Sequence, residues 1–103
     1  MIGEPTNLNE QKEQVPFDFS LEQNYPNPFN PTTNVSFSVP IETFVTVKIY
    51  DLLGNEIAVL VNETKTPGKY NVQFHANGFS SGVYICEMTA SNFKSTQKLV
   101  LAK

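Results

Sequence analysis

Apolar and polar residues alternate with a period of two along most of the chain after residue 17, which is the pattern of half-buried β-strands. Turn signals such as Pro67-Gly68 and Asn77-Gly78 separate the alternating runs. No interval has convincing helical periodicity. The pattern therefore predicts seven strands, at residues 17–23, 34–39, 44–51, 56–62, 69–75, 83–90 and 94–102.

The alternation also predicts which side chains face the core. Two faces are possible in the run at 83–90, and we favour Tyr84, Cys86 and Met88, because the opposite face continues onto Glu87. The run at 56–62 alternates poorly, so it is either covered on both faces or bent. In the other strands the expected inward residues are Phe17, Phe19, Leu21, Val35, Phe37, Val39, Val45, Val47, Ile49, Tyr70, Val72, Phe74, Leu99 and Leu101.

Short strands separated by regular turn signals indicate an all-β sandwich or barrel. Two stacked antiparallel sheets bury these alternating faces most economically, so we expect an immunoglobulin-like antiparallel β-sandwich of about seven strands. Tyr84 follows Gly82 by two positions, at the start of a late strand. It is either a tyrosine corner, with its hydroxyl bonded to the preceding connection, or an ordinary buried tyrosine.

Three prolines occur within six residues at Pro26, Pro28 and Pro31. Each fixes its own φ, lacks a backbone donor and keeps the residue before it out of the helical region. This stretch is therefore neither a helix nor a central strand, but a stiff connection between the first and second strands. We predict that Tyr25 and Phe29, on either side of Asn27, cap one end of the core.

Composition divides the 103 residues into two parts. Residues 1–16 are rich in Glu, Gln and Asn and are expected to form a flexible linker, whereas residues 17–103 form a single domain. The net charge is −3 and the chain has no arginine, which argues against nucleic-acid binding. No apolar run is long enough to cross a bilayer, so direct membrane insertion is not expected.

Residues that could carry chemistry are few. The chain has one histidine and one cysteine, His75 and Cys86, on different predicted strands. We expect His75 to be solvated and Cys86 to be a small core residue that cannot form an internal disulfide. A metal site or a nucleophilic pair needs several such residues close together, and one histidine and one cysteine on different predicted strands do not provide them. We therefore expect a non-catalytic protein without a metal or cofactor.

Four blocks closely resemble the C-terminal sorting domain of proteins exported by the type IX secretion system. They are LEQNYPNPFNPTTNVSFSVP at 21–40, VKIYDLLGNEIAVLV at 47–61, SGVYICEMTA at 81–90 and STQKLVLAK at 95–103. The YPNPFNP block is specific, whereas the YDxxG and SGVY blocks also occur in hook-capping proteins of the flagellum. The sequence departs from the usual pattern in two places: Cys86 replaces a common aromatic residue, and Gln97-Lys98 replaces a frequent basic pair.

The resemblance implies a domain that follows a larger cargo and is recognised by the outer-membrane translocon. It also implies that a surface sortase-like peptidase cleaves in residues 1–16, so that the cargo is anchored at the outer-membrane surface or released. The part most closely tied to export would be the basic, apolar tail, which consists of Lys98, Leu99, Val100, Leu101, Ala102 and Lys103.

Three further possibilities remain open at the level of sequence. The final strand could pair with a strand of its partner by β-augmentation. The domain could instead be a structural or adhesive immunoglobulin-like module, or a carbohydrate-binding accessory domain of an extracellular enzyme.

Overall fold

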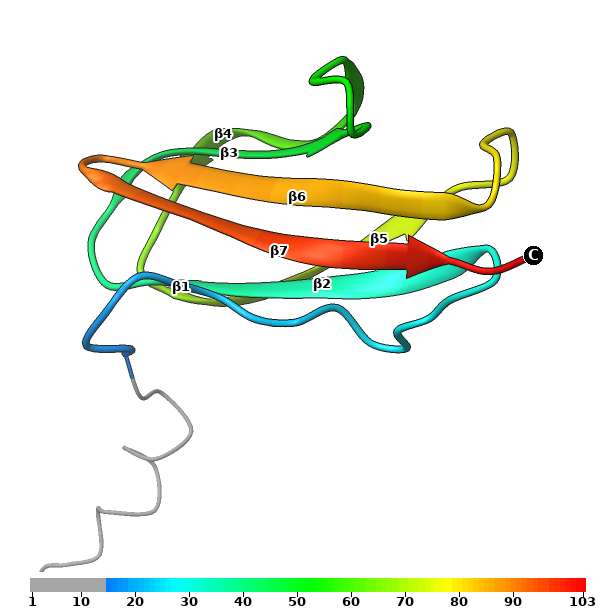
Figure 1. Cartoon of the computed structure of the whole chain (residues 1–103). Coiled ribbons are helices and arrows are strands. Elements are labelled where there is room, and N and C mark those ends of the chain that lie inside the picture. The colour runs from blue at the N-terminus through cyan, green and yellow to red at the C-terminus, as the bar shows by residue number, and fades with distance from the viewer. Residues whose placement is uncertain (1–14) are drawn as a thin grey trace, which may run out of the picture.

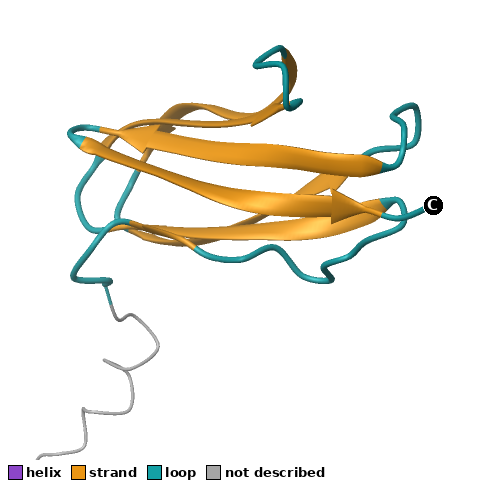
Figure 2. Ribbon diagram, viewed as in Figure 1, coloured by secondary structure: helices purple, strands orange, loops and turns teal. Residues whose placement is uncertain are grey.

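A computed structural model describes residues 15–103, which form two antiparallel sheets packed face to face (Figures 1 and 2). The expected linker at residues 1–16 lies outside the described residues, apart from Val15 and Pro16. The described part of the chain has no helix of the length and hydropathy needed to cross a bilayer.

All seven predicted strands are present, and the immunoglobulin-like sandwich is confirmed. One sheet has the order β1-β2-β5 and the other the order β4-β3-β6-β7. β4 pairs with β3 and not with β5, so it belongs to the four-stranded sheet. The strands are β1 (Ser20–Leu21), β2 (Thr32–Val39), β3 (Thr43–Tyr50), β4 (Glu56–Lys65), β5 (Gly68–His75), β6 (Gly82–Ala90) and β7 (Phe93–Leu101).

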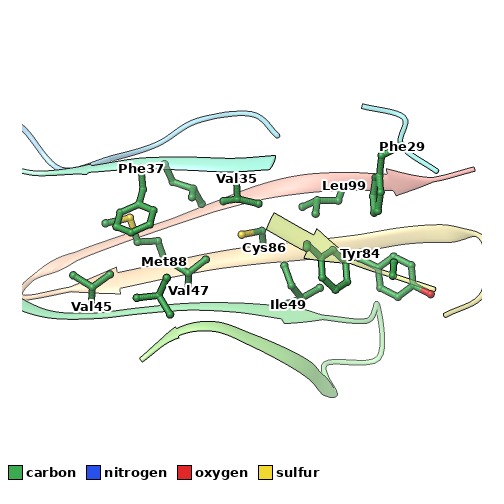
Figure 3. Close-up of a cluster of buried hydrophobic side chains, with 14 of the residues drawn as sticks. Phe29, Val35, Phe37, Val45, Val47, Ile49, Tyr84, Cys86, Met88 and Leu99 are labelled. Carbon is green, nitrogen blue, oxygen red and sulfur yellow. The ribbon is translucent and has the colours of Figure 1, made fainter. Parts of the chain in front are cut away.

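The core lies between the two sheets and is built from the alternating residues (Figure 3). Val45, Val47 and Ile49 of β3 are fully buried, as their spacing predicts. In β6 the favoured set is confirmed, because Tyr84, Cys86 and Met88 are buried and Glu87 faces outward into an ion pair. Burial of the inward face of each strand supplies the main favourable free energy of this fold.

The poorly alternating run in β4 is bent. Its pairing with β3 shifts register twice, between Val47 and Lys48 and between Ile49 and Tyr50. Leu60 and Ile57 are the extra residues, since Lys48 lies opposite Val59 and Tyr50 opposite Glu56. An extra residue reverses the side-chain alternation at that point, which explains why no single period fits this strand.

The first predicted strand is much shorter than expected, and the inward assignment of Phe17 is wrong. Ser20 pairs with Ser38 and Leu21 with Phe37, and if this register continued toward Phe17 it would set Asp18 opposite Pro40. Proline has no N–H to donate, so pairing stops there and Phe17 lies exposed. Phe19 is partly buried and stacks on Phe93 of β7, with the ring centroids 5.4 Å apart.

Tyr84 forms the tyrosine corner. Its hydroxyl donates to the main-chain carbonyl of Ser80 at 2.6 Å, across the connection between β5 and β6. Gly82 between them has a φ of 151°, a conformation that residues with a Cβ rarely adopt. The SGVY block therefore fixes the start of β6, the strand on which β7 pairs.

Candidate functional site

The tail residues form the second half of β7 and the two positions after it. Leu99 and Leu101 point into the core, whereas Lys98 and Val100 lie on the outer face of the four-stranded sheet (Figure 3 labels Leu99). The chain then continues to Ala102 and Lys103, both exposed. Two of the six tail residues are therefore part of the core, and the other four present side chains to a partner.

The edge of β7 that does not pair with β6 is contacted by residues 21–29, which we call the covering segment. This segment leaves β1 in the three-stranded sheet and crosses to β7 in the other sheet (Figure 1). There Phe29 lies beside Leu101 in a parallel bridge. The Phe29 N–H donates to the Val100 carbonyl, and the Phe29 carbonyl accepts from the Ala102 N–H, both at 2.9 Å.

Side chains extend this cover along the strand. The Asn27 Oδ1 accepts a hydrogen bond from the Val100 N–H at 2.9 Å, and the Gln23 amide donates to the Lys98 carbonyl at 2.8 Å. In return, the Gln97 amide donates to the Leu21 carbonyl at 3.0 Å. Main-chain groups of alternate residues point to the same edge of a strand, and from Lys98 to Ala102 that edge already has partners.

The prediction that Tyr25 caps the core is wrong, whereas the prediction for Phe29 is confirmed. Phe29 is only 2% exposed and packs against Phe74, but Tyr25 is 78% exposed. The Tyr25 main chain forms two hydrogen bonds with Asn34 of β2, which extends the pairing of β1 beyond Leu21. Since Asn24 points inward at this position, the next side chain along the extended chain points out.

Asn24 takes the place that was expected for Tyr25. It is buried, and its amide donates to the Pro26 carbonyl at 3.1 Å and to the Thr33 hydroxyl at 2.9 Å. The Thr33 hydroxyl donates to the same Pro26 carbonyl at 2.8 Å. Sequence reasoning missed this pair. Thr33 could have been found by extending the inward series of Val35 and Phe37 by one step.

The last residue is also held by the fold. The Lys103 N–H donates to the Ser81 hydroxyl at 3.0 Å, and its ammonium group donates to the Asn77 carbonyl at 2.9 Å. Both partners lie in the connection that the hydroxyl of Tyr84 also bonds. The tail is therefore docked along its whole length rather than projecting as a free peptide.

The lysines of the outer face differ in their partners. Lys94 of β7 pairs with Glu87 at 3.3 Å, and Lys48 of β3 pairs with Glu56 at 3.2 Å. Lys98 takes part in no ion pair among residues 15–103. Of the lysines on this face of β7, Lys98 is thus the one whose charge remains available to a partner.

The two residues considered for chemistry lie on different sheets. Cys86 is buried in β6, and this burial, together with the charge of Glu87, raises the pKa of its thiol to about 12. His75 is exposed at the end of β5, with its Nδ1 3.1 Å from the Thr32 hydroxyl. Residues 15–103 contain no group of three or more His, Cys, Asp or Glu side chains that could hold a metal ion.

A family model described as the secretion system C-terminal sorting domain matches residues 23–102. The chain belongs to this family. The matched range runs from the covering segment through β7, so it includes both partners of the covered edge. This sorting domain is a type IX secretion signal that leads to export across the outer membrane, and its family is generally non-catalytic. A comparison with curated proteins finds no match for the chain.

Proposed function

We propose that the outer-membrane translocon of the type IX system recognises the tail of this domain while the tail remains part of the folded sandwich. The accessible side chains would be Lys98, Val100, Ala102 and Lys103. The observation that supports this proposal is the covered edge of β7, where Phe29 and Asn27 already occupy the main-chain groups of Val100 and Ala102.

This proposal differs from β-augmentation at the tail. A partner strand would need the outward N–H and C=O groups of β7, and it would have to displace residues 21–29 to reach them between Lys98 and Ala102. Such displacement would also withdraw Phe29 from the core. Recognition through side chains requires neither change, so it is the mode we favour.

We further propose that a cargo is attached on the N-terminal side of the domain. A surface sortase-like peptidase would act in residues 1–16, after which the cargo is anchored at the outer-membrane surface or released. The sandwich would remain folded through this step, since β1 begins only at Ser20.

The test is a fusion of the full chain to a periplasmic reporter in a type IX-competent cell. We expect the reporter to reach the cell surface. The double substitution Lys98→Ala with Val100→Thr should abolish surface delivery without unfolding the domain, because both side chains lie on the outer face.

A matched control lies on the same face of the same strand. The double substitution Lys94→Ala with Thr96→Ala changes two exposed positions outside the tail and should leave surface delivery intact. Retention of the unmodified fusion in the periplasm would contradict the sorting function. Equal losses in the two double variants would contradict the assignment of recognition to the tail.

A further inference from the structure

Apolar side chains of β6 lie directly beside the accessible residues of the tail, and one from β3 lies on the far side of β6. In the paired register Val83 is opposite Val100, and Ile85 is opposite Lys98. Tyr50 of β3 is opposite Ile85 from the other side. All of these alternate with buried residues of their own strands, so they share the outer face of the four-stranded sheet.

A turn with two exposed leucines continues from this row. Leu52 and Leu53, which follow Tyr50 and Asp51, are 68% and 88% exposed. Figure 1 shows the connection between β3 and β4 rising from the four-stranded sheet on the side away from the three-stranded sheet. The leucines contribute nothing to the core, and two adjacent leucines at this exposure form an apolar surface that water solvates poorly.

The turn that carries the leucines is held in one conformation. The Asp51 Oδ1 accepts hydrogen bonds from the N–H groups of Leu53 and Asn55, at 3.0 and 2.9 Å, and its Oδ2 accepts from the Asn55 side chain at 3.0 Å. Gly54 supplies the φ of 91° that closes the turn. Binding through the leucines would therefore cost little conformational entropy, because the loop is already ordered.

We propose that Tyr50, Leu52, Leu53, Val83 and Ile85, which we call the outer platform, form one docking surface with Val100 and Lys98 of the tail. Its occupant is a component of the type IX export machinery that presents an apolar surface bearing a carboxylate. This inference rests on the proposed recognition of the tail and extends it to two further strands. The platform supplies apolar contact, and Lys98 supplies the charge.

Charge favours a machinery component over a second copy of the chain. Lys48 and Lys94 on this face are matched by Glu56 and Glu87, so the available charge is the ammonium group of Lys98. In a two-fold dimer through the same patch both copies would contribute the same residues, so two Lys98 charges would enter an apolar interface that supplies no carboxylate to pair with them, which is unfavourable. A partner that carries a carboxylate at this position has no such conflict.

The test uses the reporter fusion with Leu52→Ser and Leu53→Ser together. Removing one or two central apolar contacts of an interface should lower surface delivery by about tenfold. The melting temperature of the purified chain should not change, because neither side chain is in the core. Ile85→Thr, on a neighbouring strand, should give a loss in the same direction.

Phe44→Ser is the matched control, because Phe44 is an exposed apolar residue (53%) on the same outer face at the opposite end of β3. Delivery at the native level by the leucine variant, or an equal loss with Phe44→Ser, would overturn the docking surface. So would a dimer in solution that the leucine substitutions dissociate. If Lys98→Ala with Val100→Thr abolishes delivery while the leucine variant does not, the inference fails and the proposed function stands.

Discussion

The two edge strands of the four-stranded sheet avoid unwanted pairing in different ways. β4 is interrupted by two register shifts and carries Glu56, Glu63 and Lys65 along its length. β7 pairs with β6 in continuous register over nine residues, and its edge is covered from Lys98 to Ala102 by residues of the segment 21–29. Irregularity and charge protect the first edge, and a segment from the opposite sheet protects the second.

The difference indicates what each edge is for. A bulged, charged strand is disfavoured as a template for any partner, which suits an edge without a binding role. A regular strand covered by its own chain keeps an ordered row of outward side chains while its main chain is withheld from other strands. In our account, Lys98 and Val100 belong to that row.

The largest effect is expected from shortening β7. Removal of residues 99–103 deletes the buried Leu99 and Leu101, each worth about 2–5 kcal/mol. That sum approaches the whole stability of a domain of this size, about 5–15 kcal/mol, so the shortened chain should not fold. Loss of the cooperative thermal transition in near-UV circular dichroism would confirm this.

A cooperative transition in the shortened chain would contradict the docked tail. The expectation also affects how export data are interpreted. Lost export after such a deletion does not locate the signal, because the core is lost together with the tail. Outward substitutions such as Lys98→Ala separate the two effects.

The next largest effect concerns the covering segment. Phe29→Ala should lower the free energy of unfolding by about 3–5 kcal/mol, because it empties a buried site against Phe74. Tyr25→Ala, in the same segment but exposed, should change it by no more than about 0.5 kcal/mol. Chemical denaturation measures both. Unchanged stability with lost export in Phe29→Ala would assign the segment a direct role in recognition.

A smaller effect is expected from the buried polar pair that anchors the segment. Asn24→Ala should cost about 1–3 kcal/mol, because it removes the three hydrogen bonds of the Asn24 side chain with Gln23, Pro26 and Thr33. Amide hydrogen exchange should show faster exchange at the Ala102 N–H, which bonds Phe29. Exchange at the native rate would mean that Asn24 does not hold the cover on β7.

The smallest effect concerns the turn at the start of β4. Hydrogen bonds from the Asn55 side chain and N–H, and from the Leu53 N–H, lower the pKa of Asp51 below 3.8. A carboxylate whose pKa is lowered by folding stabilises the fold at pH values above its ordinary pKa. This contribution is lost as the pH falls through the folded-state pKa. The melting temperature should therefore fall less steeply with pH below about pH 4 in Asp51→Asn than in the native chain. Identical acid profiles would contradict the role of the carboxylate.

The local pattern predicted the strands and most of the core, because a side chain's face depends on its immediate neighbours. It placed Val45, Val47 and Ile49 correctly, and it left two interpretations of Tyr84, of which the hydrogen bond to Ser80 supports the tyrosine corner. It failed for Tyr25, whose direction depends on pairing with Asn34.

The candidate site was predictable only in part. The tail follows from alternation and family resemblance, but its cover does not. Asn27 and Val100 are 73 residues apart, and nothing in the period of either segment encodes their hydrogen bond. The gathering of Tyr50, Ile85 and Val100 on one face likewise depends on the strand order, which the sequence pattern does not specify.

The most direct test of recognition in the folded state is to loosen the cover and follow export. Gln23→Ala with Asn27→Ala removes two hydrogen bonds to β7 from exposed side chains and should cost about 1–3 kcal/mol in total. Pulse-chase measurement of surface delivery gives the rate for the fused reporter. If the docked tail is recognised through its side chains, the rate should equal that of the native chain. Faster delivery would contradict the account, because it would mean that β7 is recognised after its edge is released.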